Sequence, residues 1–167
     1  MKFICNKDTI LSVVQTTSKA AAGKSSIQAL EGILMELEGN TLTVTGYDLD
    51  IGIKTSIEVE GIESGNIVIS AKMAVDIIRK MPSGSITFEC SGNNLAEITN
   101  NMTSFSVSCS SADDYPNVPQ VNPDTSFTMP QKLLKSMIIQ TKFAVAVVDS
   151  KPALSLSLRT TYSVLLL

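Results

Sequence analysis

The stretch that decides the fold is Ile67–Met81, which reads IVISAKMAVDIIRKM. Its first residues form a short apolar run that is typical of a buried strand. Apolar side chains then recur at the three- and four-residue spacing of a helix, at Met73, Ile77, Ile78 and Met81. Pro82 follows and favours the end of a helix. The stretch therefore predicts a strand that passes directly into a helix.

This pattern occurs three times along the chain. Residues 127–142, FTMPQKLLKSMIIQTK, align with it at a shift of sixty residues, and residues 3–17 align with this last occurrence at a shift of 124. Helices are expected at about 9–22, 71–81 and 131–142. Three segments with alternating apolar and polar residues follow each of the first two helices, as in half-buried antiparallel strands. A strand–helix–three-strand unit is thus predicted to repeat.

The repeat predicts an α+β fold with helices on one face of antiparallel sheets. Residues 1–122 are expected to form a first domain of two units. Residues 112–125 hold three prolines and little periodicity, so they are interpreted as a linker. Residues 123–167 are then the incomplete start of a second domain, with a divergent tail from about residue 155.

A hairpin is expected around Glu38–Thr41, because apolar residues alternate on both sides of this polar turn. Beyond Gly46 the apolar residues change from even to odd positions, beginning with Tyr47, Leu49 and Ile51. We therefore expect a β-bulge at Gly46.

The composition excludes several kinds of protein. Hydrophobic residues make up 44% of the chain and charged residues 17%, which argues against disorder. The chain has no histidine, the commonest general base, and its three cysteines cannot pair evenly into a disulfide framework. Charges near the N-terminus and the short apolar run at the other end indicate neither export nor a membrane anchor. A cytoplasmic location is expected.

Charge is distributed unevenly along the chain. The net charge of -3 argues, by itself, against a nucleic-acid partner. The three expected helices nevertheless hold only two acids, Asp8 and Asp76, against seven cations: Lys19, Lys72, Arg79, Lys80, Lys132, Lys135 and Lys142. If the helices share one face, that face suits a polyanion that is bound without reading its sequence. No aromatic residues lie between these cations, which favours binding to the backbone of a duplex over stacking with the bases of a single strand. The alternative is a helix surface that lysine merely solvates.

Other patterns that suggest chemistry are weaker. Residues 22–26, AGKSS, resemble the end of a phosphate-binding loop, but they follow a helix, whereas such a loop opens one. Asp48 and Asp50 lie on one face of an expected strand, where a solvated face is the ordinary interpretation and a cation site the rarer one. The cysteines occupy apolar strand positions with no neighbouring base and are interpreted as small buried residues. No cofactor, no metal and no catalytic residue is predicted.

Several short sequence segments, in their order and spacing, resemble the bacterial DNA polymerase III beta subunit family, the replicative sliding clamps. They are Met1-Lys2-Phe3, residues 30–37, LTVTGYDL at 42–49, Asp76-Ile77-Ile78-Arg79, Asp114-Tyr115-Pro116-Asn117 and Met129-Pro130. The resemblance runs from residue 1 to about Leu154. It implies the DNA clamp fold, in which two subunits of three domains form a ring with helices lining the hole. It also implies a processivity factor that encircles duplex DNA and has DNA polymerase III and the clamp loader as partners.

The resemblance implies particular DNA contacts. Lys24 and Lys72 occupy positions that are cationic and DNA-contacting in the family, and Lys19, Arg79 and Lys80 extend the set by charge and helix placement. In the loop after the third helix the family places polar and aromatic contacts, for which Lys151 is the substitute here.

The subunit interface of the family corresponds to Ile77, Phe105 and Val107. In the family a third domain covers these positions. We expect the three side chains to be uncovered on an edge strand in this chain.

The end of the chain departs from the family. Residues 155–167, SLSLRTTYSVLLL, show no match, and a frameshift or a gene-model fragment would produce such a tail. We therefore expect a truncated clamp chain without the partner pocket. The alternatives are a non-functional fragment, a protein-interaction module without DNA binding, and an enzyme with a carboxylate or thiol site, against which the lack of histidine argues.

Overall fold

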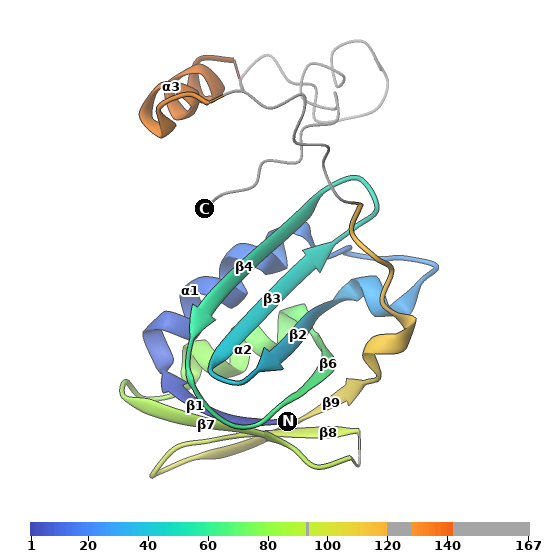
Figure 1. Cartoon of the computed structure of the whole chain (residues 1–167), viewed down its shortest axis with the longest axis vertical. Coiled ribbons are helices and arrows are strands. Elements are labelled where there is room, and N and C mark those ends of the chain that lie inside the picture. Colours follow the sequence, from blue (N-terminus) through green and yellow to red (C-terminus); the bar gives the residue numbers. More distant parts are fainter. Residues whose placement is uncertain (93, 120–127, 142–167) are drawn as a thin grey trace. The chain divides into compact units, whose positions relative to one another are not determined.

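The computed structural model describes residues 1–92, 94–119 and 128–141. The chain divides into two compact parts (Figure 1). The first contains residues 1–118, and the second contains α3 (Gln131–Thr141). The border expected near residue 122 lies outside the described residues.

The first part contains the predicted repeat unit twice. The first repeat unit comprises β1 (Lys2–Asn6), α1 (Lys7–Thr17), β2 (Gly32–Glu38), β3 (Thr41–Tyr47) and β4 (Gly52–Glu58), followed by the short β5 (Glu60–Glu63). The second comprises β6 (Gly65–Ser70), α2 (Ala71–Lys80), β7 (Ser85–Cys90), β8 (Leu95–Thr99) and β9 (Ser104–Ser110). Short 3-10 turns lie at Ser18–Ala20, Gln28–Glu31 and Ala112–Asp114. The predicted order of one strand, one helix and three strands is confirmed in both units.

In both units the last residue of the first strand caps the helix. The Asn6 side chain accepts hydrogen bonds from the backbone N–H groups of Asp8 at 2.9 Å and Thr9 at 3.4 Å. The Ser70 hydroxyl accepts one from the N–H of Met73 at 3.5 Å. Each cap satisfies an otherwise unpaired donor and contributes about 1 kcal/mol. The chain can therefore leave the sheet and enter the helix without an intervening loop.

The strands form one nine-stranded antiparallel sheet in the order β4-β3-β2-β6-β9-β8-β7-β1-β5. The first strand of each unit lies beside a strand of the other: β1 pairs with β7, and β6 pairs with β2. The two edge strands, β4 and β5, are separated along the chain by Val59 alone, so the sheet curls back on itself. Neither unit completes its part of the sheet without the other.

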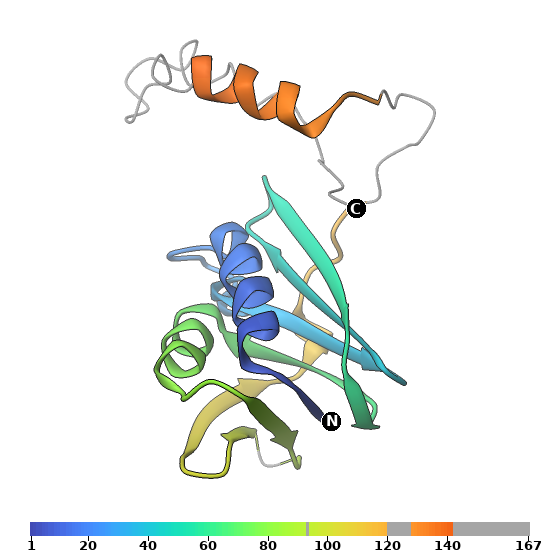
Figure 2. The ribbon, with the colours of Figure 1, turned by 90° about the vertical axis from the view of Figure 1, so that its left-hand side faces the viewer.

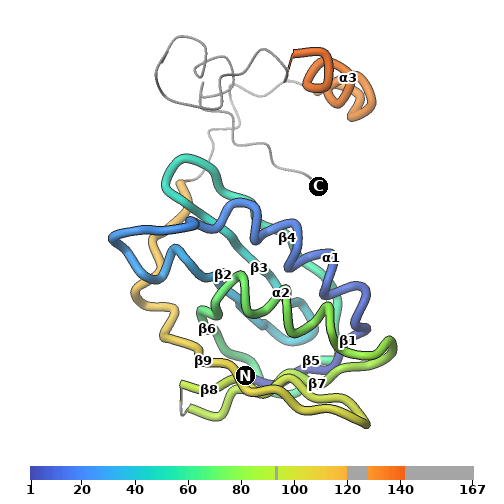
Figure 3. The backbone as a smooth tube through the Cα atoms, turned by 180° about the vertical axis from the view of Figure 1, so that it is seen from behind, coloured from blue at the N-terminus to red at the C-terminus, as the bar shows by residue number. Residues whose placement is uncertain are grey.

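Both helices lie on the same side of this sheet, in contact with each other (Figure 2). They run antiparallel (Figure 3). At one end, the N–H of Lys7 donates a 2.9 Å hydrogen bond to the carbonyl oxygen of Gly84, just beyond α2. At the other end, Ser18 and Lys72 line the same groove. The predicted placement of helices on one face of antiparallel strands is confirmed.

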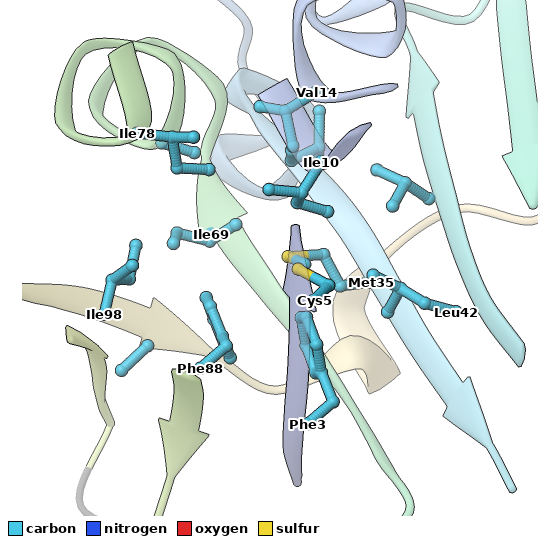
Figure 4. Close-up of a cluster of buried hydrophobic side chains, with 14 of the residues drawn as sticks. Phe3, Cys5, Ile10, Val14, Met35, Leu42, Ile69, Ile78, Phe88 and Ile98 are labelled. Atoms are coloured by element: carbon cyan, nitrogen blue, oxygen red, sulfur yellow. The ribbon is translucent and has the colours of Figure 1, made fainter. Parts of the chain in front are cut away.

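The hydrophobic core lies between the helices and the sheet (Figure 4). Phe3 of β1 stacks on Phe88, its register partner in β7, with ring centroids 5.1 Å apart. Ile10 and Val14 of α1 and Ile78 of α2 are at most 2% exposed. Burying each such side chain contributes roughly 1.5–3 kcal/mol. Because these side chains come from both units, the core is shared between them.

The β-bulge predicted at Gly46 is wrong. β3 pairs with β4 in unbroken register up to its last residue. The change in apolar positions has two causes. Val44 of β3 belongs to the main core, whereas Tyr47 belongs to a second cluster, and the turn after β3 places odd positions of β4, such as Ile53, beside even positions of β3. In this turn the Asp48 carboxylate accepts hydrogen bonds from the N–H groups of Asp50 at 3.0 Å and Ile51 at 2.7 Å. Leu49 in this turn has a positive φ of 79°, and its side chain is 53% exposed.

The helices deviate slightly from their predicted bounds. α1 begins before residue 9 because Asn6 caps it, and a 3-10 turn follows it from Ser18. Residues 128–130 are not in a strand, and residue 127 lies outside the described ones. Four apolar side chains of α3 are 41% to 52% exposed: Leu133, Met137, Ile138 and Ile139. Within the described ranges, no helix is both long and apolar enough to cross a bilayer.

Candidate nucleic-acid interface

The charges of the first part are sorted between its two layers. The helical layer, defined as α1, the turn Ser18–Ala20 and α2, holds two acids, Asp8 and Asp76, and five cations: Lys7, Lys19, Lys72, Arg79 and Lys80. The strands hold two cations, Lys2 and Lys54, and seven acids: Glu36, Glu38, Glu58, Glu60, Glu63, Glu89 and Glu97. One layer of an acidic chain is therefore basic.

The antiparallel helices divide the predicted contact residues into two groups. Lys19 follows α1, Lys24 lies in the next loop, and Lys72 lies in the first turn of α2, so all three belong to one end of the helix pair. Arg79 and Lys80 belong to the other end. All five side chains are exposed. Lys151 lies outside the described residues.

Lys7 joins Arg79 and Lys80 at their end of the helix pair. Its ammonium group lies 3.5 Å from the Asp8 carboxylate, and the Arg79 guanidinium lies 3.6 Å from the Asp76 carboxylate. The Arg79 side chain is 58% exposed, and an exposed pair contributes about 0–1 kcal/mol, so a phosphate can compete for Arg79. The Lys7 side chain is only 12% exposed, so it adds positive charge to this end without offering an open contact. Lys7 was missed in the sequence because the helix was expected to begin at about residue 9. Asn6 was the available signal, since asparagine is a strong N-cap.

A groove of about 930 Å³ lies at the Lys72 end, between the turn after α1, the start of α2 and the end of β9. Its other charged lining residues are Glu31, Asp76 and Asp114. Glu31 also accepts a 3.2 Å hydrogen bond from the N–H of Ser25, which holds the loop that carries Lys24. Because carboxylates outnumber cations in its lining, the groove itself does not suit phosphate. The exposed ammonium groups around the groove are suited to binding phosphate.

The remaining candidates for chemistry do not form a site. Residues 22–26 connect two 3-10 turns and open no α-helix. Asp48 and Asp50 lie in a turn, so their expected place on a strand face is wrong. In the described part of the chain, no group of three or more histidine, cysteine, aspartate or glutamate side chains could hold a metal ion.

The three predicted interface residues are less exposed than expected. Ile77 is 8% and Val107 is 5% exposed, and both belong to the core, whereas Phe105 is half-buried. β9 has β6 and β8 as neighbours, so it is not an edge strand. The expectation of three uncovered side chains is therefore wrong for Ile77 and Val107. β6 pairs only with the end of β9, at Cys109 and Ser110, so the rest of β9 pairs with β8 alone among the described strands.

Residues 1–119 match the family described as DNA polymerase III beta subunit, N-terminal domain. The chain belongs to this family. Among curated relatives in it, the beta sliding clamps of Halalkalibacterium halodurans and Bacillus subtilis are each 32% identical over 163 residues. The alignments cover 93% of this chain and 43% of either relative, so the chain spans less than half the length of the clamps it matches.

Solved structures of the family share the fold. A putative DNA polymerase III beta subunit from Eubacterium rectale superposes with a TM-score of 0.85 at 31% identity, over 93% of this chain and 42% of that one. The DNA polymerase sliding clamp of Bacillus subtilis gives a TM-score of 0.81 at 31% identity, over 91% of this chain and 42% of that one. The DNA clamp fold expected from the sequence is confirmed.

Proposed function

We propose that this chain provides the first domain, and the start of the second, of a sliding clamp that acts as a processivity factor in DNA replication. The sorting of charge carries the proposal: a basic helical layer and acidic strands in one acidic chain. A ring whose helices face its hole presents cations to the DNA and acids to the solvent. This role requires no catalysis, and we infer that the chain is not an enzyme.

A clamp needs only weak contacts with DNA, because a closed ring stays on the duplex by enclosing it. Exposed lysine and arginine side chains at both ends of the helix pair can neutralise phosphates and release counterions without reading bases. Lys24 and Lys72 are the first candidates for such contacts, and Lys19, Arg79 and Lys80 support them. Salt bridges with neighbouring acids are too weak to prevent this.

The partners follow from the same proposal. Residues 1–122 correspond to a first clamp domain and residues 123–167 to the beginning of a second. The ring is a homodimer that binds DNA polymerase III and the clamp loader, and it acts in the cytoplasm. Ile77, Phe105 and Val107 belong to its subunit interface, where the part of β9 that pairs with β8 alone supports the addition of a partner strand.

Fluorescence anisotropy of a labelled duplex, titrated with the 167-residue chain at several salt concentrations, tests the DNA contacts. The expected dissociation constant is about 10⁻⁴ M or weaker at physiological salt, because an open chain lacks topological retention. Reversal of Lys24 and Lys72 to glutamate should weaken binding at low salt. It should also reduce the slope of log affinity against log salt by about 0.9 for each lost phosphate contact.

Lys54→Glu is the matched control for Lys72→Glu. Lys54 lies on β4 with a side chain that is 58% exposed, and its reversal changes the net charge of the chain equally. If both single variants weaken binding to the same degree, net charge alone explains the affinity and the helical layer is not the DNA face. A wild-type chain without any salt-dependent affinity would instead favour a protein-interaction module.

A further inference from the structure

The sulfur atoms of Cys90 and Cys109 lie 3.2 Å apart. Cys90 ends β7, and Cys109 lies near the end of β9, on the far side of β8. Ala96 of β8, the register partner of Cys90, is fully buried, and its partner on the other side is Val107, two residues before Cys109. Both thiols are free.

We propose that Cys90 and Cys109 form a reversible disulfide that fastens β9 to β7 across β8. The sulfurs have to approach by about 1.1 Å to reach the S–S bond length of ~2.05 Å. Because β8 separates the two strands, the backbones at Cys90 and Cys109 also have to draw together until their Cα atoms lie within ~6.8 Å of each other. Cys109 is held on both sides, by its pairing with Ile69 of β6 and by the 2.9 Å hydrogen bond from its N–H to the carbonyl oxygen of Asn94. Cys90 ends β7 and borders the turn at Ser91 and Gly92, so most of the backbone adjustment falls to Cys90. Nineteen positions separate the two residues along the chain, so the bond would close a loop within the second repeat unit.

The oxidant is a small-molecule disulfide, such as oxidised glutathione, and the reaction is thiol–disulfide exchange. The Cys90 thiolate attacks one sulfur of the oxidant, forms a mixed disulfide and releases one small thiolate. That thiolate takes the proton of Cys109, whose sulfur then attacks the Cys90 sulfur and expels the second small thiolate. The second small thiolate takes up the proton that Cys90 released on forming its thiolate. Two protein thiols thus lose two electrons, and one small disulfide is reduced to two thiols.

The surroundings favour this order of attack. Cys90 is half-buried, whereas Cys109 is only 9% exposed. Burial, together with the hydrogen bond to Cys90, raises the pKa of the Cys109 thiol to about 12, so very little of it is thiolate at neutral pH and the more accessible Cys90 is the first nucleophile. Cys109 also lines the 930 Å³ groove, through which a small oxidant can reach the pair.

Cys5 provides the internal comparison. It lies on β1 within the core and is 8% exposed, and burial raises the pKa of its thiol to about 12 as well. Within the described ranges, the sulfur–sulfur contact joins Cys90 and Cys109 and does not include Cys5. The short sulfur–sulfur distance therefore distinguishes Cys90 and Cys109 from Cys5.

In the test, the reduced 167-residue chain is incubated with oxidised glutathione. The free thiols are then counted, and mass spectrometry measures the intact mass and identifies cross-linked peptides. The expected result is the loss of two of three thiols, a Cys90–Cys109 cross-linked peptide, and full recovery with dithiothreitol. The bond should raise the thermal midpoint by about 10 °C, because it restricts the unfolded chain. Cys5→Ser should preserve all of these changes, and Cys90→Ser and Cys109→Ser should abolish them.

Three free thiols after incubation, a stable glutathione adduct in place of the cross-link, or a bond that includes Cys5 would each overturn the proposal. Peptide mapping of the wild-type chain gives the answer even if a serine variant fails to fold. Loss of duplex binding bears only on the clamp proposal, because the disulfide is measured without DNA.

Discussion

Gly46 on β3 lies so close to the carbonyl oxygen of Thr17, the last residue of α1, that a Cβ atom at this position would overlap it. The end of α1 thus packs directly on the backbone of β3. Ala22 N–H, beyond this contact, donates a 2.8 Å hydrogen bond to the carbonyl oxygen of Leu30. Glycine is required here for close packing rather than for a bulge, and the contact fixes the position from which Lys19 and Lys24 project.

Gly46→Ala should therefore destabilise the fold. The new methyl group meets backbone atoms that cannot rotate away, and overpacking of this kind costs about 1–3 kcal/mol. Gly23→Ala is the matched control, since a Cβ atom there meets no heavy atom within 4 Å. Urea denaturation of the two variants checks the prediction, and equal midpoints would show that α1 can move away from β3 at little cost.

Tyr115 joins the segment after β9 to the sheet. Its hydroxyl donates a 3.3 Å hydrogen bond to the carbonyl oxygen of Thr45, and its ring packs in a second cluster with Leu30, Tyr47 and Val68. Tyr115→Phe leaves that buried carbonyl without this donor and should cost about 1–2 kcal/mol. Tyr47→Phe should cost less, because its hydroxyl bonds to the carbonyl of Leu49, which lies in an exposed turn.

The pH dependence of stability gives an independent check on Tyr115. Burial raises the pKa of its hydroxyl to about 12 in the folded state, against 10.0 for an ordinary tyrosine. The stability that the protonated Tyr115 hydroxyl contributes is complete below pH 10. It is lost as the pH rises toward 12, because this tyrosine ionises first in the unfolded chain. The advantage of wild type over Tyr115→Phe should then shrink by about 1.4 kcal/mol at pH 11. A constant difference between pH 8 and 11 would contradict burial of this hydroxyl.

The interlocked strands make a prediction about folding. Because β1 pairs with β7 and β6 pairs with β2, a peptide of residues 65–118 lacks two of its sheet neighbours and half of the core. It should remain unfolded alone and gain structure only when mixed with residues 1–64. Circular dichroism of each peptide and of the mixture measures this. Cooperative unfolding of residues 65–118 alone would show that the second repeat unit is self-sufficient.

The sequence allowed the repeat and the helical layer to be predicted, because both depend on local periodicity. Ile77 and Ile78 recur at helical spacing whatever surrounds them, and sixty-residue self-similarity needs no knowledge of tertiary contacts. The exchange of β1 and β6 between units was not predicted, because strand pairing between distant segments leaves no trace in the alternation of a single strand.

The errors have the same origin. The change of apolar positions was assigned to a bulge at Gly46, because the contact of Gly46 with Thr17 joins residues that are distant in sequence. Val107 was expected to be uncovered because a third domain covers this position in the family, but in this chain the core already buries it. The proximity of Cys90 and Cys109 depends on the registers of β8 with β7 and with β9, which alternation alone does not determine. The DNA contacts were assigned by charge and resemblance, and they stay a prediction.

The last prediction separates Phe105 from Val107, two neighbours on the same face of β9. Val107 is 5% exposed and belongs to the core, so Val107→Ser removes packed methyl groups and buries a hydroxyl, at a cost of about 2–3 kcal/mol. Phe105 is only half-buried, so Phe105→Ser should cost less and reduce apolar contact with a partner chain. Urea denaturation should therefore distinguish the two variants.

Sedimentation velocity completes this comparison, because residues 104–108 of β9 pair with β8 alone among the described strands and can add a strand from another copy. Any self-association of the 167-residue chain should decrease in Phe105→Ser while its unfolding midpoint stays close to wild type. Leu95→Ser is the control, since Leu95 is 48% exposed at the start of β8. Equal decreases in both variants would assign the association to general surface hydrophobicity, and a decrease in Phe105→Ser alone would assign it to this part of β9.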